Sequence, residues 1–322
     1  MIRMTTPRSA ITAGALRVLV MALFGVLIIW AAATLAFVIT NVLPGDPVEV
    51  MLGPQAQISD EVKDALREEL GLTQPLWNQY VAYISGLAHG DLGESLQLRM
   101  PVVDVIGRQF GSTLQLTALA LLFALVIAAA VTLLARGPRS RRVAATAELI
   151  VLSAPVFWIG LLLLTVFAFG LGWFPVSGSR GAASLVLPAL TLALPCAALI
   201  GQLVRDGVEE AEQQPFAFTV RARGASDLRL LTHHTLRHGS IGAVTMAGYL
   251  IGSLLGGAVL VETVFARQGV GRVALTAIIN RDLPVIAGVI VLSALIFTVI
   301  AIVSDVVMTI LDPRLRGGGR RS

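Results

Sequence analysis

Long runs of apolar residues alternate with shorter polar segments along most of the chain. A helix needs about 20 residues to cross the hydrocarbon core of a bilayer, and the longest apolar runs reach that length. The pattern therefore predicts membrane-spanning helices. Six runs qualify, at residues 16–40, 113–134, 147–171, 185–204, 241–265 and 285–311.

The first apolar run follows Arg3, Arg8 and Arg17 and so has the basic flank of a secretory signal peptide. The hydrophobic region of a cleavable signal is about 7 to 15 residues long, whereas this run continues further without a charge. We therefore interpret residues 16–40 as an uncleaved first span.

The segment between the first two apolar runs, residues 41–111, is polar and rich in Asp and Glu. It predicts a small module outside the membrane. One helix is expected to begin at Ser59 and stop at Gly71. A second is expected from Pro75 to Leu87, with its aromatic side chains in a core or at the membrane interface.

The composition agrees with an all-α integral membrane protein. Hydrophobic residues make up 56% and charged residues only 14% of the chain, and the mean hydropathy is +0.82. These values lie outside the range of soluble domains. The formal net charge is +4 and the arginines lie between apolar runs, so topology explains them better than nucleic-acid binding does. Cys196 is the one cysteine, which leaves no disulfide framework or cysteine metal site.

The distribution of arginine predicts the orientation, because short loops rich in Lys and Arg stay in the cytoplasm. Both termini and the segment 205–239 are then cytoplasmic, and the acidic module lies outside. The cytoplasmic set is Arg3, Arg8, Arg17, Arg136, Arg139, Arg141, Arg142, Arg205, Arg221, Arg223, Arg229, Arg237, Arg314, Arg316, Arg320 and Arg321. The predicted organisation is 1–40 for the N-terminus and first span, 41–111 for the module, 112–311 for a transmembrane domain of five helices, and 312–322 for a cytoplasmic tail.

Few ionisable side chains fall within the spans, and each is a functional candidate because a charge in the membrane is costly. These candidates are Glu148, Glu262 and Asp305. Each can instead pair with a neighbouring helix or subunit. We retain Gln115, Gln202, Glu262 and Asp305 as candidates for the translocation pathway or an interface.

The sequence argues against several chemistries. All four histidines, His89, His233, His234 and His238, lie outside the spans, which leaves an intramembrane hydrolase or metal centre without support. No run matches the phosphate loop of nucleotide hydrolases. A secondary transporter would show a richer polar relay and internal repeats. Active transport by this chain would therefore draw its energy from another subunit.

The charged segment 205–239 contains a short helix signature. Pro215 suits a first helical position and Gly224 suits a left-handed helix end. Phe216 and Phe218 lie beside arginines, a combination typical of a protein-docking surface. The alternative is that both phenylalanines lie at the lipid interface.

A second helix is expected to follow, with Ser226 as its N-cap. Its predicted apolar side consists of Leu228, Leu231 and Leu236, and its polar side of Arg229, His233 and Arg237.

The segment around Phe216–Gly224 resembles the cytoplasmic loop of importer-type ABC transporter permeases, and runs along most of the chain resemble the dipeptide and oligopeptide branch. Two departures are the Phe216-Ala217-Phe218 run before Thr219, and the lack of an Asn and a Pro within 237–242. The matching runs are Leu43–Pro47, Leu70–Leu72 with Gln74–Pro75, Gly90–Gly93 with Ser95, Pro101–Val102, Thr113–Leu114, Gly252–Val259, Val261–Phe265, Gly269–Gly271, Asn280–Asp282 with Pro284, Asp305 and Leu311–Arg314.

The resemblance implies a type I ABC importer permease with six transmembrane helices in the cytoplasmic (inner) membrane. It implies a helix that docks on an ATPase and relays its closure to the spans. The implied coupling residues are Phe216, Phe218, Thr219, Arg221, Ala222, Arg223 and Gly224.

The same resemblance implies the partners. They are a second, similar but non-identical permease, two ATPase subunits that carry ATP and Mg, and an extracytoplasmic solute-binding protein. The chain itself is then not an enzyme and binds no cofactor or metal. The implied activity is import of di- or oligopeptides by alternating access. Nickel, glutathione and haem-like cargo are alternatives, as are a self-contained carrier or channel and a membrane anchor without a transport role.

Overall fold

The computed structural model describes residues 7–42, 47–52, 59–69, 71–135, 137–179, 181–236, 239, 242 and 246–311. Side chains are described in these ranges from residue 19 onward, apart from 247, 248 and 307–311. Parts of the sequence predictions lie outside the described residues, namely 1–6, 43–46, Leu70, Arg136, Arg180, Arg237, His238, Ser240, Ile241 and 312–322.

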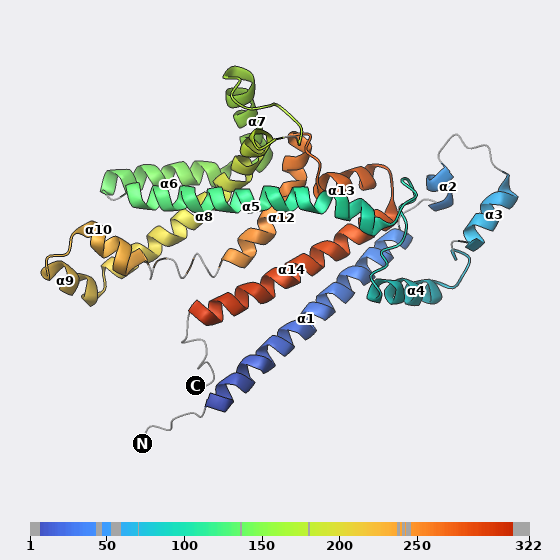
Figure 1. Ribbon diagram of the computed structural model, residues 1–322, viewed down its shortest axis with the longest axis horizontal. Helices are drawn as coiled ribbons and strands as arrows, with labels where there is room; N and C mark the ends of the chain where they lie inside the picture. Colours follow the sequence, from blue (N-terminus) through green and yellow to red (C-terminus); the bar gives the residue numbers. More distant parts are fainter. Residues whose placement is uncertain are drawn as a thin grey trace. The chain divides into compact units, whose positions relative to one another are not determined.

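The described elements are helical, and an isolated bridge joins Glu94 to Pro101 (Figure 1). The helices are α1 (Pro7–Val42), α2 (Pro47–Leu52), α3 (Asp60–Glu69), α4 (Leu76–Ala88), α5 (Val102–Leu134), α6 (Pro138–Ser153), α7 (Val156–Leu163), η1 (Leu164–Gly170), α8 (Ala183–Glu212), α9 (Pro215–Ala222), α10 (Asp227–Leu230), η2 (Leu231–Thr235), α12 (Ala247–Val264), α13 (Val270–Ile279) and α14 (Leu283–Leu311).

The chain divides into two compact units. Unit 1 comprises Met1–Gly111, Arg272–Val303 and Asp312–Ser322, and unit 2 comprises Ser112–Gly271 and Ser304–Leu311. We describe each unit separately.

Unit 1 contains α1 to α4 and most of α14. Gly25 on α1 lies against Thr298 on α14, and a Cβ atom at position 25 would overlap with the threonine side chain. The small residue therefore permits the two long helices to approach closely. Tyr80 and Tyr83 of α4 pack on Phe37 of α1, with ring centroids 5.3 and 5.8 Å from it.

The two helices predicted in the acidic module are confirmed. Helix α3 begins directly after Ser59, and Gly71 has the left-handed φ of +68° that was expected beyond its end. Helix α4 begins directly after Pro75. Tyr80 and Tyr83 are partly buried against Phe37, whereas Trp77 is 69% exposed.

The third predicted apolar run, 147–171, is helical on both sides of a sharp break. The chain breaks between α6 and α7, and the axes on either side are bent by 106°. Pro155 lies at the break and lacks the backbone N–H that a continuous helix requires. Ala154 before it has the extended conformation that a following proline favours (φ −86°, ψ 135°).

Unit 2 is built around α8, which packs against α6, α7, η2 and α12. Its packed face carries small residues such as Ala189, Ala193 and Ala197, all buried. Small side chains let neighbouring helices approach closely in a membrane protein.

Four described helices, α1, α5, α8 and α14, are long and apolar enough to cross a membrane over at least part of their length. The bent segment from α6 through η1 qualifies as a fifth when its parts are taken together, and α12 is a shorter apolar helix. Each of the six predicted apolar runs contains one or more of these helices where the structure describes it.

Candidate functional site

The short helix predicted within segment 205–239 is α9, and its local signals are confirmed. Gln214 precedes it in an extended conformation, and Pro215 occupies its first turn. Gly224 beyond its end has φ +81°, a conformation that side chains other than glycine rarely adopt. A proline at the start and a glycine at the end thus limit α9 to about two turns.

Helix α9 contacts its own chain on one side and is open on the other. Ala217 is fully buried and Phe216 is half-buried. Phe218 is 67% exposed. The two phenylalanines that the sequence grouped together therefore differ, because only Phe218 extends fully from the surface. The other predicted coupling residues that are exposed are Thr219, Arg221, Ala222, Arg223 and Gly224.

The turn after α9 is fixed by polar contacts. Arg221 Nε donates to Asp227 Oδ1 at 3.4 Å. Ser226 Oγ accepts from Arg229 N at 3.4 Å, which confirms the predicted N-cap of α10. These contacts tie α9 to the next helix, so the two form one compact lobe.

The predicted apolar side of that next helix is partly wrong. Leu230 and Leu231 are buried, whereas Leu228 is 44% exposed. The helix passes into the π-helical turn η2 directly after Leu230. A π turn spaces hydrogen bonds five residues apart and so shifts which residues share a face.

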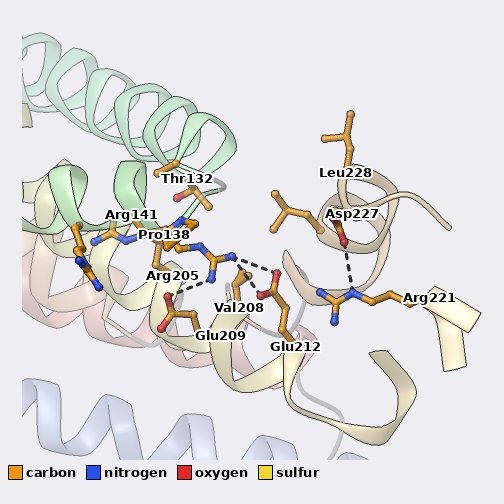
Figure 2. A pocket seen from close by; sticks show the side chains of 13 residues that line it. Thr132, Pro138, Arg141, Arg205, Val208, Glu209, Glu212, Arg221, Asp227 and Leu228 are labelled. Carbon is orange, nitrogen blue, oxygen red and sulfur yellow. Dashed lines mark hydrogen bonds and ion pairs between the residues drawn. The ribbon is translucent and has the colours of Figure 1, made fainter. Parts of the chain in front are cut away.

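Beside this lobe lies a cavity of about 660 Å³ (Figure 2). Its walls come from the C-terminal end of α5, the start of α6, the C-terminal half of α8, and the lobe itself. The residues that line it are Thr132, Ala135, Pro138, Arg141, Arg142, Arg205, Val208, Glu209, Glu212, Arg221, Asp227, Leu228 and Leu231.

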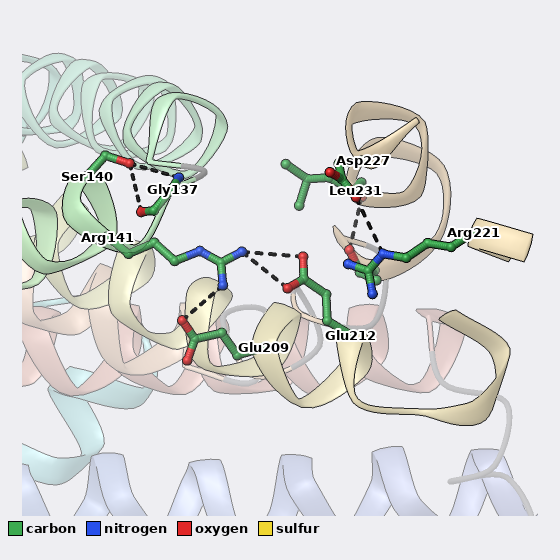
Figure 3. A network of polar contacts seen from close by, with 9 residues as sticks. Gly137, Ser140, Arg141, Glu209, Glu212, Arg221, Asp227 and Leu231 are labelled. Carbon is green, nitrogen blue, oxygen red and sulfur yellow. Dashed lines mark hydrogen bonds and ion pairs between the residues drawn. The ribbon is translucent and has the colours of Figure 1, made fainter. Parts of the chain in front are cut away.

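A carboxylate clamp fixes one wall of the cavity (Figure 3). We use this name for Arg141 of α6 together with Glu209 and Glu212 of α8. Arg141 Nη1 lies 3.3 Å from Glu209 Oε1, and Arg141 Nη2 lies 3.2 Å from Glu212 Oε2. The clamp therefore joins the start of α6 to the last turn of α8, directly before α9.

A second ion pair lies deeper along the same helices. Arg205 of α8 forms a bidentate pair with Glu148 of α6, and both side chains are buried. Gly201 leaves room for it, since a Cβ atom there would lie 2.8 Å from Glu148 Oε1. The pairing agrees with the structural interpretation of Glu148 from sequence.

Near the C-terminal end of α12, Glu262 is fully buried. Thr113 Oγ1 donates to Glu262 Oε1 at 2.6 Å and accepts from Val270 N at 2.9 Å. A Cβ atom at Gly269 would overlap with the Glu262 carboxylate, so glycine is required for this close approach. The glutamate thus joins the loop before α13 to the N-terminal half of α5.

Arg267 lies in the loop next to this glutamate and is 2% exposed. Its Nε and Nη1 atoms have no hydrogen-bond partner among the described residues. Burial lowers the pKa of the Arg267 guanidinium, and the Glu262 carboxylate opposes that shift.

The remaining pathway candidates lie on different helices. Gln115 is exposed on α5, Gln202 is partly buried on α8 and Asp305 is partly buried on α14. Sequence reasoning did not single out Arg141, Glu209 or Glu212. The spacing of the two glutamates at i and i+3 on one helix face was the available signal. Within the described residues, no group of three or more His, Cys, Asp or Glu side chains could hold a metal ion.

Comparisons with known proteins identify the family of the chain. Residues 120–317 match the model of the binding-protein-dependent transport system inner membrane component, and residues 15–117 match the model of the N-terminal part of such components. The glutathione transport system permease protein GsiC of Escherichia coli (strain K12) is 36% identical over 291 residues, covering 89% of this chain and 94% of that protein. GsiC of Shigella flexneri serotype 5b is 35% identical over the same length.

Solved structures agree on the fold. An inward-facing structure of the MetNI methionine ABC transporter matches 64% of this chain and 95% of its own chain, with a TM-score of 0.55 and 20% identity. The protein is therefore a multi-pass inner membrane protein with the type I permease fold. The chain belongs to the family of binding-protein-dependent transport system inner membrane components, the ABC importer permeases of the peptide and nickel type.

Proposed function

We propose that this chain is the permease subunit of an ATP-driven importer for short peptides or peptide-like molecules. The observation that carries the proposal is α9, a short helix on which Phe218 is exposed. Exposed aromatic side chains beside arginines are typical of the few residues that dominate a protein interface. The partner that fits this helix is the ATPase subunit of the transporter.

In the proposed mechanism, ATP binding closes two ATPase subunits and moves the α9 helices of two paired permeases. The carboxylate clamp then carries the movement of α9 to α6, because it joins α6 to the last turn of α8. The spans open outward to receive cargo from a binding protein, and hydrolysis returns them to the inward-facing state. The acidic module of unit 1 faces the binding protein in this arrangement.

Glutathione is the favoured cargo among the peptide-like molecules. It is a tripeptide, and several relatives at 35 to 36% identity bear the name of a glutathione permease. Di- and oligopeptides carry the same amide and carboxylate groups and form the wider class. Nickel has neither group and haem-like cargo has carboxylates but no peptide amides, and these are the competing possibilities.

The docking role of α9 is tested with Phe218→Ala in a transporter assembled with its partner permease, ATPases and binding protein. We expect at least about a tenfold loss of affinity between the permease pair and the ATPase, because an anchor residue is truncated. Cargo-stimulated ATP hydrolysis should fall with it. Titration of detergent-solubilised permease with the ATPase measures the first quantity, and phosphate release measures the second.

Phe169→Ala is the matched control, because Phe169 is 68% exposed but lies in η1, within the apolar bent segment. This variant should bind the ATPase as the unchanged chain does. Equal affinities for the two variants would contradict docking through α9.

Cargo is tested separately by uptake of radiolabelled glutathione into proteoliposomes that contain the whole transporter. Unlabelled glutathione and dipeptides should compete with the label, and nickel should not. Competition by nickel but not by peptides would overturn the peptide proposal without affecting the docking proposal.

A further inference from the structure

The cavity beside the α9 lobe has an apolar part as well as a charged part (Figure 2). The apolar part consists of Ala135, Pro138, Val208, Leu228 and Leu231. Leu228 is 44% exposed, whereas Ala135, Val208 and Leu231 are buried. Ligand pockets combine apolar walls with a few polar groups that orient the ligand. The exposed Leu228 thus gives a bound molecule an apolar surface to contact.

Thr132 of α5 borders the same cavity, and the protein does not use its hydroxyl group. The side chain is 6% exposed, and its Oγ1 atom has no hydrogen-bond partner among the described residues. A buried hydroxyl without a partner is unfavourable, and a molecule inside the cavity can supply one. Because a hydroxyl can donate to a carboxylate, Thr132 is suited to hold an acidic group there.

One arginine of the cavity also lacks a carboxylate partner in the part of the chain that the structure describes. Arg141, Arg205 and Arg221 each pair with a Glu or Asp side chain. Arg142 lines the cavity and forms no such pair there. A guanidinium group binds a carboxylate through two parallel hydrogen bonds. Arg142 and Thr132 therefore give the cavity two groups that bind a carboxylate.

The acidic side chains of the cavity favour a positive group in the same molecule. Glu209 contributes Oε1 to the carboxylate clamp, and its Oε2 atom forms no hydrogen bond or ion pair among the described residues. Asp227 likewise pairs through Oδ1, and its side chain is 86% exposed. These carboxylates repel a simple anion and attract an ammonium group. The cavity thus fits a molecule that carries both charges.

Resting on the proposed function, we propose that this cavity is a feedback site for a small zwitterion, an amino acid or short peptide with a free carboxylate and a free ammonium group. Its volume of about 660 Å³ is that of an ordinary ligand pocket. Glutathione has both charged groups. An importer accumulates its cargo on the cytoplasmic side, which is the side predicted for the lobe.

A molecule in the cavity touches parts that move relative to one another in the proposed mechanism. Thr132 and Arg142 belong to α5 and α6, whereas Leu228 and Leu231 belong to the lobe. A ligand shifts an equilibrium toward the arrangement that it binds better. Cargo bound to both walls therefore favours the arrangement with the lobe close to α5 and α6, and it slows the movement that ATPase closure drives.

The feedback is tested with the complete transporter in proteoliposomes, with binding protein and labelled glutathione outside and ATP inside. Unlabelled glutathione is trapped inside at increasing millimolar concentrations. We expect internal glutathione to lower the initial uptake rate and the cargo-stimulated ATP hydrolysis at least about threefold, because it stabilises one arrangement of the lobe. An uptake rate that internal glutathione leaves unchanged would overturn the proposal.

Two variants remove the groups that bind the carboxylate. Arg142→Gln and Thr132→Val should each raise the internal concentration for half-inhibition at least about tenfold, because each removes a hydrogen bond to a charged group. Uptake without internal glutathione should stay unchanged. Thr132→Val should also leave the fold intact, since the hydroxyl has no partner to lose among the described residues.

Arg139→Gln is the matched control, because Arg139 is exposed on the same turn of α6 but does not line the cavity. It removes the same charge and should leave the inhibition unchanged. Equal inhibition in Arg142→Gln, Thr132→Val and this control would overturn the proposal.

Binding is measured independently of transport by equilibrium dialysis of labelled glutathione against the detergent-solubilised transporter without binding protein. Arg142→Gln should bind at least about tenfold more weakly than Arg139→Gln. Equal binding by the two variants would overturn the proposal even if the transporter works. Loss of ATP-driven uptake in the unchanged transporter would instead contradict the proposed function, and dialysis would still decide whether the cavity binds glutathione.

Two further arms separate a zwitterionic peptide from other occupants. Inorganic phosphate should not displace glutathione in dialysis, and displacement at equal concentrations would show a general anion site and overturn the proposal. The uptake assay is repeated in vesicles with and without phosphatidylethanolamine, whose headgroup is also a zwitterion. An Arg142-dependent effect of this lipid without any effect of internal glutathione would overturn the proposal by assigning the cavity to a lipid headgroup.

Discussion

The pair of Glu148 and Arg205 shows how a membrane helix accommodates charge. Each side chain alone would be costly inside an apolar bundle, and together they form a bidentate pair between α6 and α8. Removing one partner leaves a buried charge unpaired, which is more damaging than replacing both by apolar groups. Single and double substitutions of this pair can therefore test whether its charges contribute to the stability of unit 2.

We expect Glu148→Gln to destabilise the protein by about 3 kcal/mol, because it leaves the Arg205 charge unpaired. The double variant Glu148→Leu with Arg205→Met should be about as stable as the unchanged chain. Cys196 is buried, so a thiol-reactive fluorescent dye reports unfolding on heating in detergent. A double variant as unstable as the single one would show that the charges themselves are needed.

At the residue scale, sequence identified the buried charges but not their partners. Glu148 meets a residue 57 positions away, and Glu262 meets one 149 positions away. Such contacts depend on how helices pack, which hydropathy does not encode. Packing also decides which side of an apolar helix stays exposed.

At the element scale, proline and glycine made the local predictions succeed. Pro215 and Gly224 bound α9, and Pro75 precedes α4, as expected. Pro155 likewise marks the break between α6 and α7 within the third apolar run. The π turn η2 has no comparable sequence signal, which explains why the apolar face of its helix was misassigned.

The carboxylate clamp connects the elements that a moving α9 would act on. Arg141→Ala should lower the uptake per ATP hydrolysed by about two- to fivefold. A two- to fivefold effect corresponds to about 0.4 to 1 kcal/mol, which lies within the range of about 0.2 to 1 kcal/mol typical of exposed ion pairs. Because salt screens such pairs, the difference from the unchanged chain should shrink at high ionic strength.

Arg139→Ala is the control for the clamp, because Arg139 lies on the same helix turn and is exposed. It removes the same charge without removing the contacts to Glu209 and Glu212. Uptake and ATP hydrolysis are measured together in proteoliposomes at low and high salt. Equal coupling in the two variants would show that loss of positive charge, and not the clamp, is responsible.

At the scale of the whole molecule, the chain combines membrane helices with the lobe that we propose docks on an ATPase, and its sequence has no phosphate loop for nucleotides. A self-contained carrier or channel would work without partners, whereas an ABC permease would not. We expect the purified chain, reconstituted alone in liposomes, to take up labelled glutathione no faster than empty liposomes, under a proton or sodium gradient or without one. Adding the partner permease, the ATPases, the binding protein and ATP should start uptake, and omitting ATP should abolish it. Uptake by the chain alone would contradict the importer model, because a single subunit would then contain a complete translocation pathway and need no ATPase as its energy source.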